Sequence, residues 1–195
     1  MIFPNREEYA VLCRNYNLIP VSLDLPADTE TPISVYLKVK PASPSFLLES
    51  VEGGEKLARY SFIGFDPFLT YRSGGLAGTV HCQGNGSIER LPARPLEALS
   101  IIMGRYTQPG LPGLPRFYGG AVGYLGYDAV RSLESLPMAA AGRLDLPDAW
   151  FLFPGTVLVF DHVRHILKVI VNSLPGDDPA GAFEQACTRI AGVES

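Results

Sequence analysis

Residues 156–171 have the sequence TVLVFDHVRHILKVIV, in which two apolar runs flank a polar segment. Both runs are rich in Val, Ile, Leu and Phe, a composition typical of buried β-strands. The segment between them begins with Asp161, a residue type that favours turns. The stretch therefore predicts an antiparallel hairpin over 156–171, which makes a β-sheet the centre of the fold.

A meander of shorter strands is predicted over 33–83, on the N-terminal side of this hairpin. Residues 33–40, ISVYLKVK, alternate with period two and indicate a half-buried strand. The run FLL at 46–48 indicates a more buried strand, and it ends on the polar pair Glu49 and Ser50, where a ligand has room to bind. Glycines and prolines separate the remaining predicted strands, which lie at 59–63, 68–72 and 79–83.

Helical signals flank the strands. The N-terminal helix is predicted over 5–16, because Asn5 and Glu8 have the spacing of a capping box and apolar residues follow at helical intervals. Further helices are predicted at 95–104, 128–136 and 179–191. The predicted fold class is therefore α+β, with a mainly antiparallel, sandwich-like sheet and flanking helices.

The composition predicts a folded, cytoplasmic protein that binds neither nucleic acid nor a membrane. Of the 195 residues 47% are hydrophobic, and the 16 Lys and Arg residues are outnumbered by 20 Asp and Glu residues. The chain has no leader-like start and no apolar run near the roughly 18 residues of a membrane span. Its three cysteines are odd in number and far apart, which argues against a disulfide framework or a zinc cluster.

No motif in the sequence supports catalysis by this chain. Four glycines between 119 and 126 resemble a phosphate-binding loop, but the Lys-Ser/Thr that should follow is absent. We therefore expect these glycines to allow close approach of neighbouring backbone. His162 and His165 lie in the predicted turn without a third ligand at metal-binding spacing, so we expect no metal site there.

Four motifs, in order, resemble the large subunit of anthranilate synthase. They are FLLES at 46–50, RYSFIG at 59–64, GGAVGYLGYD at 119–128 and FDHVR at 160–164. The large subunit of aminodeoxychorismate synthase, in the folate pathway, shares similar elements and is the nearest alternative. A freestanding small-molecule-binding module is a third possibility. Of the three, we favour the anthranilate synthase family.

The resemblance implies that the chain is an N-terminal regulatory part, spanning 1–195, of a subunit that makes anthranilate and pyruvate from chorismate. Such a subunit uses Mg²⁺ and takes ammonia from a glutamine amidotransferase partner, component II. In this family the N-terminal part binds L-tryptophan as a feedback inhibitor. The family's effector-binding motif and the strand beside it match Leu48, Glu49, Ser50, Val51, Arg59, Tyr60 and Ser61.

These residue types also suit tryptophan chemically. The zwitterionic amino acid needs an acceptor for its ammonium group and a cation for its carboxylate, and its indole ring needs an aromatic surface and a hydroxyl that accepts the ring N–H.

Family members are more than twice as long, and their chorismate and Mg²⁺ residues lie in a C-terminal domain. The resemblance therefore implies no catalytic residues, no metal and no cofactor in this chain, and no activity of the chain alone. It also implies an incomplete sheet with an open edge and an exposed apolar face.

Overall fold

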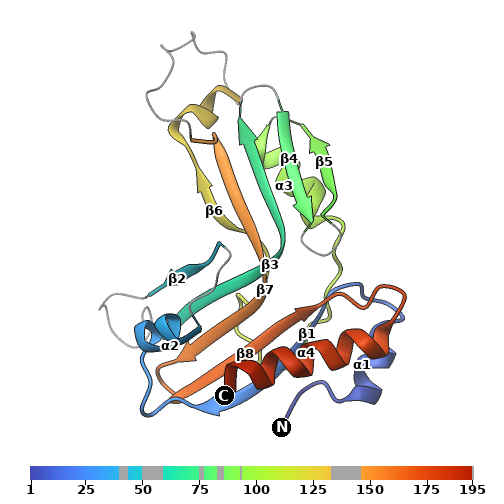
Figure 1. Cartoon of the computed structure of the whole chain (residues 1–195), viewed down its shortest axis with the longest axis vertical. Coiled ribbons are helices and arrows are strands. Elements are labelled where there is room, and N and C mark those ends of the chain that lie inside the picture. The colour runs from blue at the N-terminus through green and yellow to red at the C-terminus, as the bar shows by residue number, and fades with distance from the viewer. Residues whose placement is uncertain are drawn as a thin grey trace. The chain divides into compact units, whose positions relative to one another are not determined.

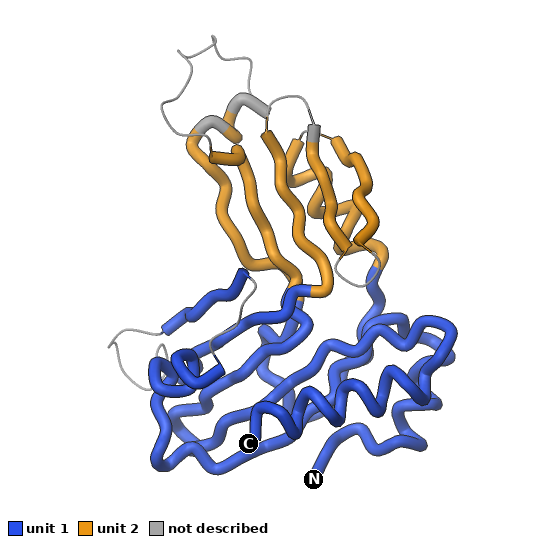
Figure 2. The backbone as a smooth tube through the Cα atoms, viewed as in Figure 1, with its two compact units in different colours: residues 1–67, 106–119, 154–195 blue, residues 68–105, 120–153 orange. Residues whose placement is uncertain are grey.

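The computed structural model describes residues 1–39, 44–49, 59–74, 77–82, 86–92, 94–132 and 146–194. The chain forms two compact units, coloured separately in Figure 2. Unit 1 contains residues 1–67, 106–119 and 154–195, and unit 2 contains residues 68–105 and 120–153. The antiparallel strands and flanking helices confirm the predicted α+β class.

Unit 1 is built on an antiparallel sheet in the order β1-β8-β7-β3-β2 (Figure 1). The strand bounds are β1 Ile19–Pro26, β2 Phe46–Leu48, β3 Tyr60–Gly74, β7 Ala149–Asp161 and β8 Ile166–Ser173. β3 and β7 are long strands whose other ends belong to unit 2. The hairpin predicted over 156–171 is observed as β7 and β8, with Thr156 opposite Val171 and Asp161 opposite Ile166.

Two helices, α1 (Arg6–Leu12) and α4 (Pro179–Glu194), pack on one face of this sheet (Figure 1). Asn5 caps α1 in a full capping box with Glu8, as the sequence predicts, although the helix ends at Leu12 rather than at 16. The Tyr9 ring contacts Phe183 of α4 at a centroid distance of 5.2 Å. Burial raises the pKa of Tyr9 to about 12, so its hydroxyl stays protonated and hydrogen-bonded to Ser173.

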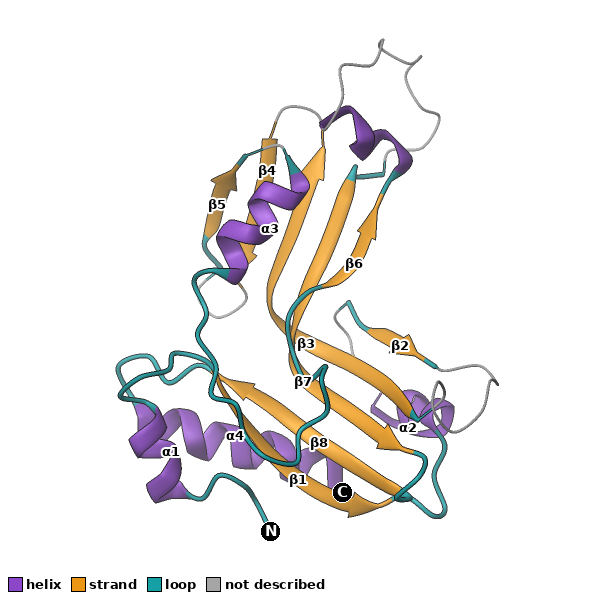
Figure 3. Cartoon of the chain, turned by 180° about the vertical axis from the view of Figure 1, so that it is seen from behind, coloured by secondary structure: helices purple, strands orange, loops and turns teal. Residues whose placement is uncertain are grey.

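The opposite face of the sheet is covered by the proline-rich loop of unit 1, residues 106–119, which crosses it in Figure 3. Val157, Val159 and Ile170 form the buried floor beneath this loop. The aromatic and aliphatic side chains packed against that floor are Tyr60, Phe62, Leu114, Phe117 and Tyr118. Because side chains alternate along a strand, the same strands fill the helical core with their other face.

Unit 2 contains the remaining parts of β3 and β7 with shorter elements around them. Its strand order is β6-β7-β3-β4-β5. The element bounds are β4 Ala77–Cys82, β5 Ile88–Leu91, α3 Pro95–Met103, β6 Val122–Leu125 and a 3₁₀-helix at Tyr127–Ser132. Its buried side chains include Leu69, Tyr71, Val80, Ala98, Ile102 and Phe153.

The prediction of a strand over 33–40 is wrong, because the structure has helix α2 at Pro32–Val39. Apolar residues in this run satisfy both periods, and the helical set Val35, Tyr36 and Val39 is the one that packs against the core. The alternating set fails, since Ile33 and Leu37 are 53% and 64% exposed. The start of the helix is fixed by Thr31 and Ser34, each of whose side chains accepts a hydrogen bond from the other's backbone N–H.

Thr31→Ala should lower the free energy of unfolding by about 1 kcal/mol, because it removes the hydroxyl that accepts the Ser34 N–H at the start of α2. Chemical denaturation monitored by circular dichroism measures this change. The matched control is Thr31→Ser, which keeps the hydroxyl and should stay within a few tenths of a kcal/mol of the parent. Equal losses in the two variants would rule out the capping role.

Candidate functional site

Leu48 and Glu49, the first of the predicted effector residues, lie at the exposed end of β2. Leu48 pairs with Phe62 of β3, and Glu49 is the residue that follows it. Both side chains are exposed, so the strand is less buried than predicted. Ser50 and Val51 lie outside the described residues. The described part of the motif therefore presents one apolar and one acidic side chain beside β3.

Arg59 and Ser61, at the start of β3, direct their side chains to the turn between β7 and β8. The Arg59 guanidinium holds the Asp161 carboxylate with two hydrogen bonds, of 2.7 and 3.2 Å. Ser61 is 2% exposed, and its Oγ lies 2.8 Å from Nε2 of His162. The Arg59 carbonyl also accepts the His162 backbone N–H. These contacts join the two predicted effector residues to the turn rather than to Leu48 and Glu49.

Asp161 is the centre of this arrangement. Its carboxylate accepts hydrogen bonds from Arg59 and from the backbone N–H groups of Val163 and Arg164. Burial alone raises the pKa of Asp161, but the Arg59 guanidinium and the two N–H groups outweigh burial and lower it. Asp161 thus stays ionised. The hairpin pattern indicated a turn at Asp161, but no signal in the sequence linked it to Arg59.

Tyr60 points to the face of β3 opposite to that of Ser61, as expected for neighbouring residues of a strand. Its ring packs with Phe62 at a centroid distance of 6.0 Å, and Phe62 meets Phe117 edge to face at 5.3 Å. The Arg59 guanidinium carbon lies 4.8 Å from the centre of the Tyr60 ring. Tyr60 therefore joins the predicted effector strand to the aromatic surface under the loop of unit 1.

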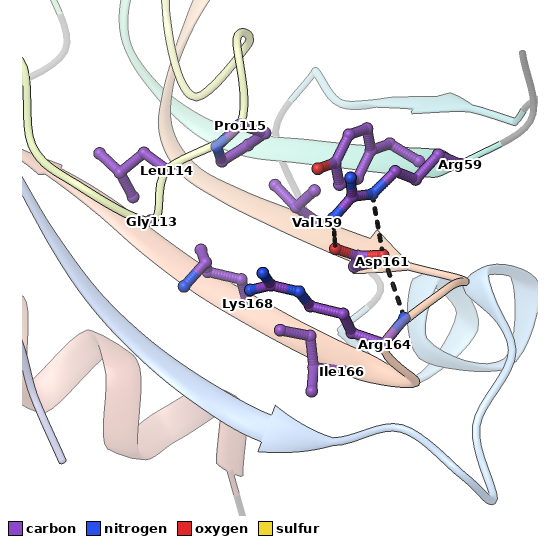
Figure 4. Close-up of a pocket in the computed structure, with 10 residues that line it drawn as sticks. Arg59, Gly113, Leu114, Pro115, Val159, Asp161, Arg164, Ile166 and Lys168 are labelled. Carbon is purple, nitrogen blue, oxygen red and sulfur yellow. Dashed lines mark hydrogen bonds and ion pairs between the residues drawn. The ribbon is translucent and has the colours of Figure 1, made fainter. Parts of the chain in front are cut away.

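A pocket of about 180 Å³ opens on this face of unit 1 (Figure 4). Its charged side chains are Arg59, Asp161, Arg164 and Lys168. Its apolar lining comes from Tyr60, Leu114, Pro115, Val159 and Ile166. The strands supply one side of the pocket and the loop supplies the other, so residues far apart in sequence meet here. The pocket can accommodate a small ligand with an apolar body and a negative charge.

Two of the four glycines, Gly123 and Gly126, have the structural role that we expected. A Cβ on Gly123 would lie 1.9 Å from the carbonyl oxygen of Trp150, and one on Gly126 would lie 3.1 Å from that of Asp148. Glycine therefore allows β6 to approach β7 closely. His165, in the β7–β8 turn, adopts a positive φ of 55°. Within the described ranges, no three His, Cys, Asp or Glu side chains gather in a way that could hold a metal ion.

No helix in the described part of the chain is long and apolar enough to cross a membrane.

No family model matches the chain. It is 43% identical over 190 residues to anthranilate synthase component 1 of Acetivibrio thermocellus, a match that covers 97% of the chain and 38% of that protein. The corresponding protein of Pseudomonas putida is 38% identical over 192 residues, with the same two coverages.

A solved structure is also similar. Anthranilate synthase component I from Streptococcus pneumoniae TIGR4 matches with a TM-score of 0.55 at 21% identity, over 86% of this chain and 35% of that one. At this identity the structural match shows a shared fold. The chain therefore spans less than half the length of the curated and structural relatives described here.

Proposed function

Because the chain matches part of anthranilate synthase component 1 along almost its whole length, we propose that it is the N-terminal, tryptophan-sensing part of such a protein. The observation that supports this most directly is the identity of 43% over 190 residues. The relatives described above all have the anthranilate synthase name, which favours this family over aminodeoxychorismate synthase and over a freestanding binding module.

The arrangement of β2 and β3 supports an effector site at the residues named from the sequence. Antiparallel pairing puts Leu48 opposite Phe62, so Glu49 emerges beside the segment that carries Tyr60 and Ser61. In the proposed site, Glu49 accepts the ammonium group of L-tryptophan and Tyr60 offers an aromatic surface to the indole. Arg59 acts indirectly, because its guanidinium is held by Asp161.

For the full-length protein, the proposal includes formation of anthranilate and pyruvate from chorismate and ammonia, within tryptophan biosynthesis in the cytoplasm. The proposed partners are a glutamine amidotransferase, component II, and a chorismate-binding domain on the same polypeptide. The family requires Mg²⁺, but the described residues of this chain include no cluster suited to that ion. We therefore assign no catalytic step to the residues described here.

Glu49→Gln in the full-length enzyme should weaken inhibition by tryptophan while leaving uninhibited turnover nearly unchanged. A hydrogen bond to a charged group contributes about 1.5–3 kcal/mol, so the inhibition constant should rise by roughly 10-fold to 150-fold. Ser50→Ala should have the same direction of effect. Steady-state assays of anthranilate formation across a tryptophan titration measure both quantities.

The control variant for Glu49→Gln is Glu97→Gln, which neutralises another exposed carboxylate in the first turn of α3. It should leave the inhibition constant unchanged. An unchanged inhibition constant in Glu49→Gln would remove that residue from the effector site. A loss of uninhibited turnover would show instead that Glu49 supports the reaction or the fold.

A further inference from the structure

We propose that the pocket between the β7–β8 hairpin and the loop of unit 1 binds a small organic carboxylate with an apolar body, separately from tryptophan. The charges that line the pocket, its apolar floor and its size all suit such a ligand. The pocket shares Arg59 and Tyr60 with the proposed effector residues, but its other two cations, Arg164 and Lys168, are not among them.

The pocket has an excess of positive charge. Three cations and one carboxylate line it, and the carboxylate, Asp161, is already occupied by Arg59 and by two backbone N–H groups. Lys168 pairs with Asp24, which is not a lining residue, and the Lys168 side chain is only 13% exposed. Arg164 has no acidic partner within the described parts of the chain. An anion in the pocket would therefore gain attraction that the protein itself leaves unused.

Arg164 is placed to meet such an anion. Its backbone N–H donates to Asp161, which fixes the start of the side chain. In Figure 4 the side chain extends from the turn along β8 towards Lys168. A guanidinium binds a carboxylate through two parallel N–H groups, and a neighbouring ammonium adds a third donor. The Arg164 guanidinium can therefore bind a carboxylate, and the Lys168 ammonium has donors beyond the one that pairs with Asp24.

The rest of the lining selects an apolar body over a bare inorganic ion. Leu114 and Pro115 face Val159 and Ile166 across the pocket, and Val159 is 1% exposed. Phosphate would make little contact with the small apolar surface that remains exposed here, whereas a ring or short aliphatic body would cover it, at about 25 cal/mol per Å². A volume of about 180 Å³ limits the ligand to a small molecule. The surplus positive charge also disfavours a zwitterion, whose ammonium group it would repel.

Benzoate is the probe that tests this chemistry. It should be titrated into the isotope-labelled 195-residue chain, with amide shifts followed by NMR. Benzoate should shift the amides of Leu114, Arg164 and Lys168 in a saturable way. Neutral benzamide should bind at least about tenfold more weakly, because it lacks the charge. Inorganic phosphate should also bind more weakly, because it lacks the apolar body. Raised salt should weaken benzoate binding, since the attraction is partly electrostatic.

Arg164→Gln should weaken benzoate binding about tenfold or more, and Arg164→Lys should recover part of that loss. Arg14→Gln, which removes a cation of unit 1 that does not line the pocket, should have no effect. The dispersion of the amide spectrum shows whether each variant is folded, and Arg164→Lys provides a second variant should Arg164→Gln unfold.

Several results would overturn the proposal. They are the absence of saturable shifts with benzoate, equal binding of benzamide or phosphate, and unchanged benzoate affinity in Arg164→Gln. Competition between L-tryptophan and benzoate for the same amides would also overturn it, because the pocket would then be the effector site. That outcome differs from a failure of the tryptophan proposal, which Glu49→Gln tests in the full-length enzyme.

Discussion

Asp161→Asn should lower the free energy of unfolding by about 2–3 kcal/mol. The carboxylate is 7% exposed and accepts hydrogen bonds from Arg59, Val163 and Arg164. An amide keeps its volume but loses its charge, and it turns a donor towards groups that are themselves donors. Removing one member of a buried ion pair costs about 3–5 kcal/mol, and solvent at the partly exposed Arg59 reduces that figure.

Urea denaturation at several pH values gives the sharpest test of this expectation. The pKa of Asp161 is lower in the folded chain than in the unfolded chain, so its stabilising effect is complete above the unfolded pKa of about 4. The effect is lost as the pH falls through the folded pKa. The difference between the parent and Asp161→Asn should therefore be largest near neutral pH and shrink in acid.

Asp177→Asn is the matched control, because Asp177 is exposed beyond the end of β8. It should change stability by less than about 0.5 kcal/mol at every pH. A constant difference between the parent and Asp161→Asn from neutral to acidic pH would show that the ionised carboxylate is not the stabilising group.

Gly155→Ala should destabilise unit 1 by about 3 kcal/mol or more. A Cβ at this position would lie 2.4 Å from the carbonyl oxygen of Asp66, which belongs to the adjacent strand β3. Backbone cannot rotate away as a flexible side chain can, so the strands must separate. Asp66 itself has a φ of 47°, which leaves it little freedom to adjust without further strain.

Gly110→Ala is the control, since a Cβ there meets no atom within 4 Å and Gly110 is not among the glycines with a positive φ. It should be neutral or slightly stabilising, because alanine restricts the unfolded chain. Thermal unfolding of the two variants compares them directly. Similar melting temperatures for Gly155→Ala and the parent would mean that β3 and β7 tolerate a wider separation at this point.

The sequence correctly predicted elements whose apolar residues fit the spacing of a strand or of a helix, but not both. The hairpin at 156–171 has apolar runs that no helical face explains, and it is present as β7 and β8. Helix α2 was missed because its apolar residues fit both periods, and the choice is made by the Thr31–Ser34 cap and by packing of Val35 on the core. Neither contact is visible without the fold, although Thr31 and Pro32 together are a usable signal for a helix start.

The site was predictable as a set of chemical groups but not as an arrangement. The sequence named Arg59 and Ser61. Their partners Asp161 and His162, at the end of β7 and in the turn after it, lie 102 and 101 residues later in the chain. Local patterns fix the face on which a side chain lies, but long-range strand pairing decides its neighbour. The pocket at Arg164 and Lys168 depends on the loop at 113–115 and was not predicted.

The pairing of β1 with β8 has a consequence for how the protein is made. Ile19 pairs with Ser173, so β1 cannot pair with β8 until roughly 150 further residues have been synthesised. At about 5–20 residues per second, the wait is on the order of ten to thirty seconds. Closing so long a loop is also entropically slow. During that time the apolar face of β1 has no partner strand, so we expect the nascent chain to depend on chaperones and its yield to improve at lower growth temperature.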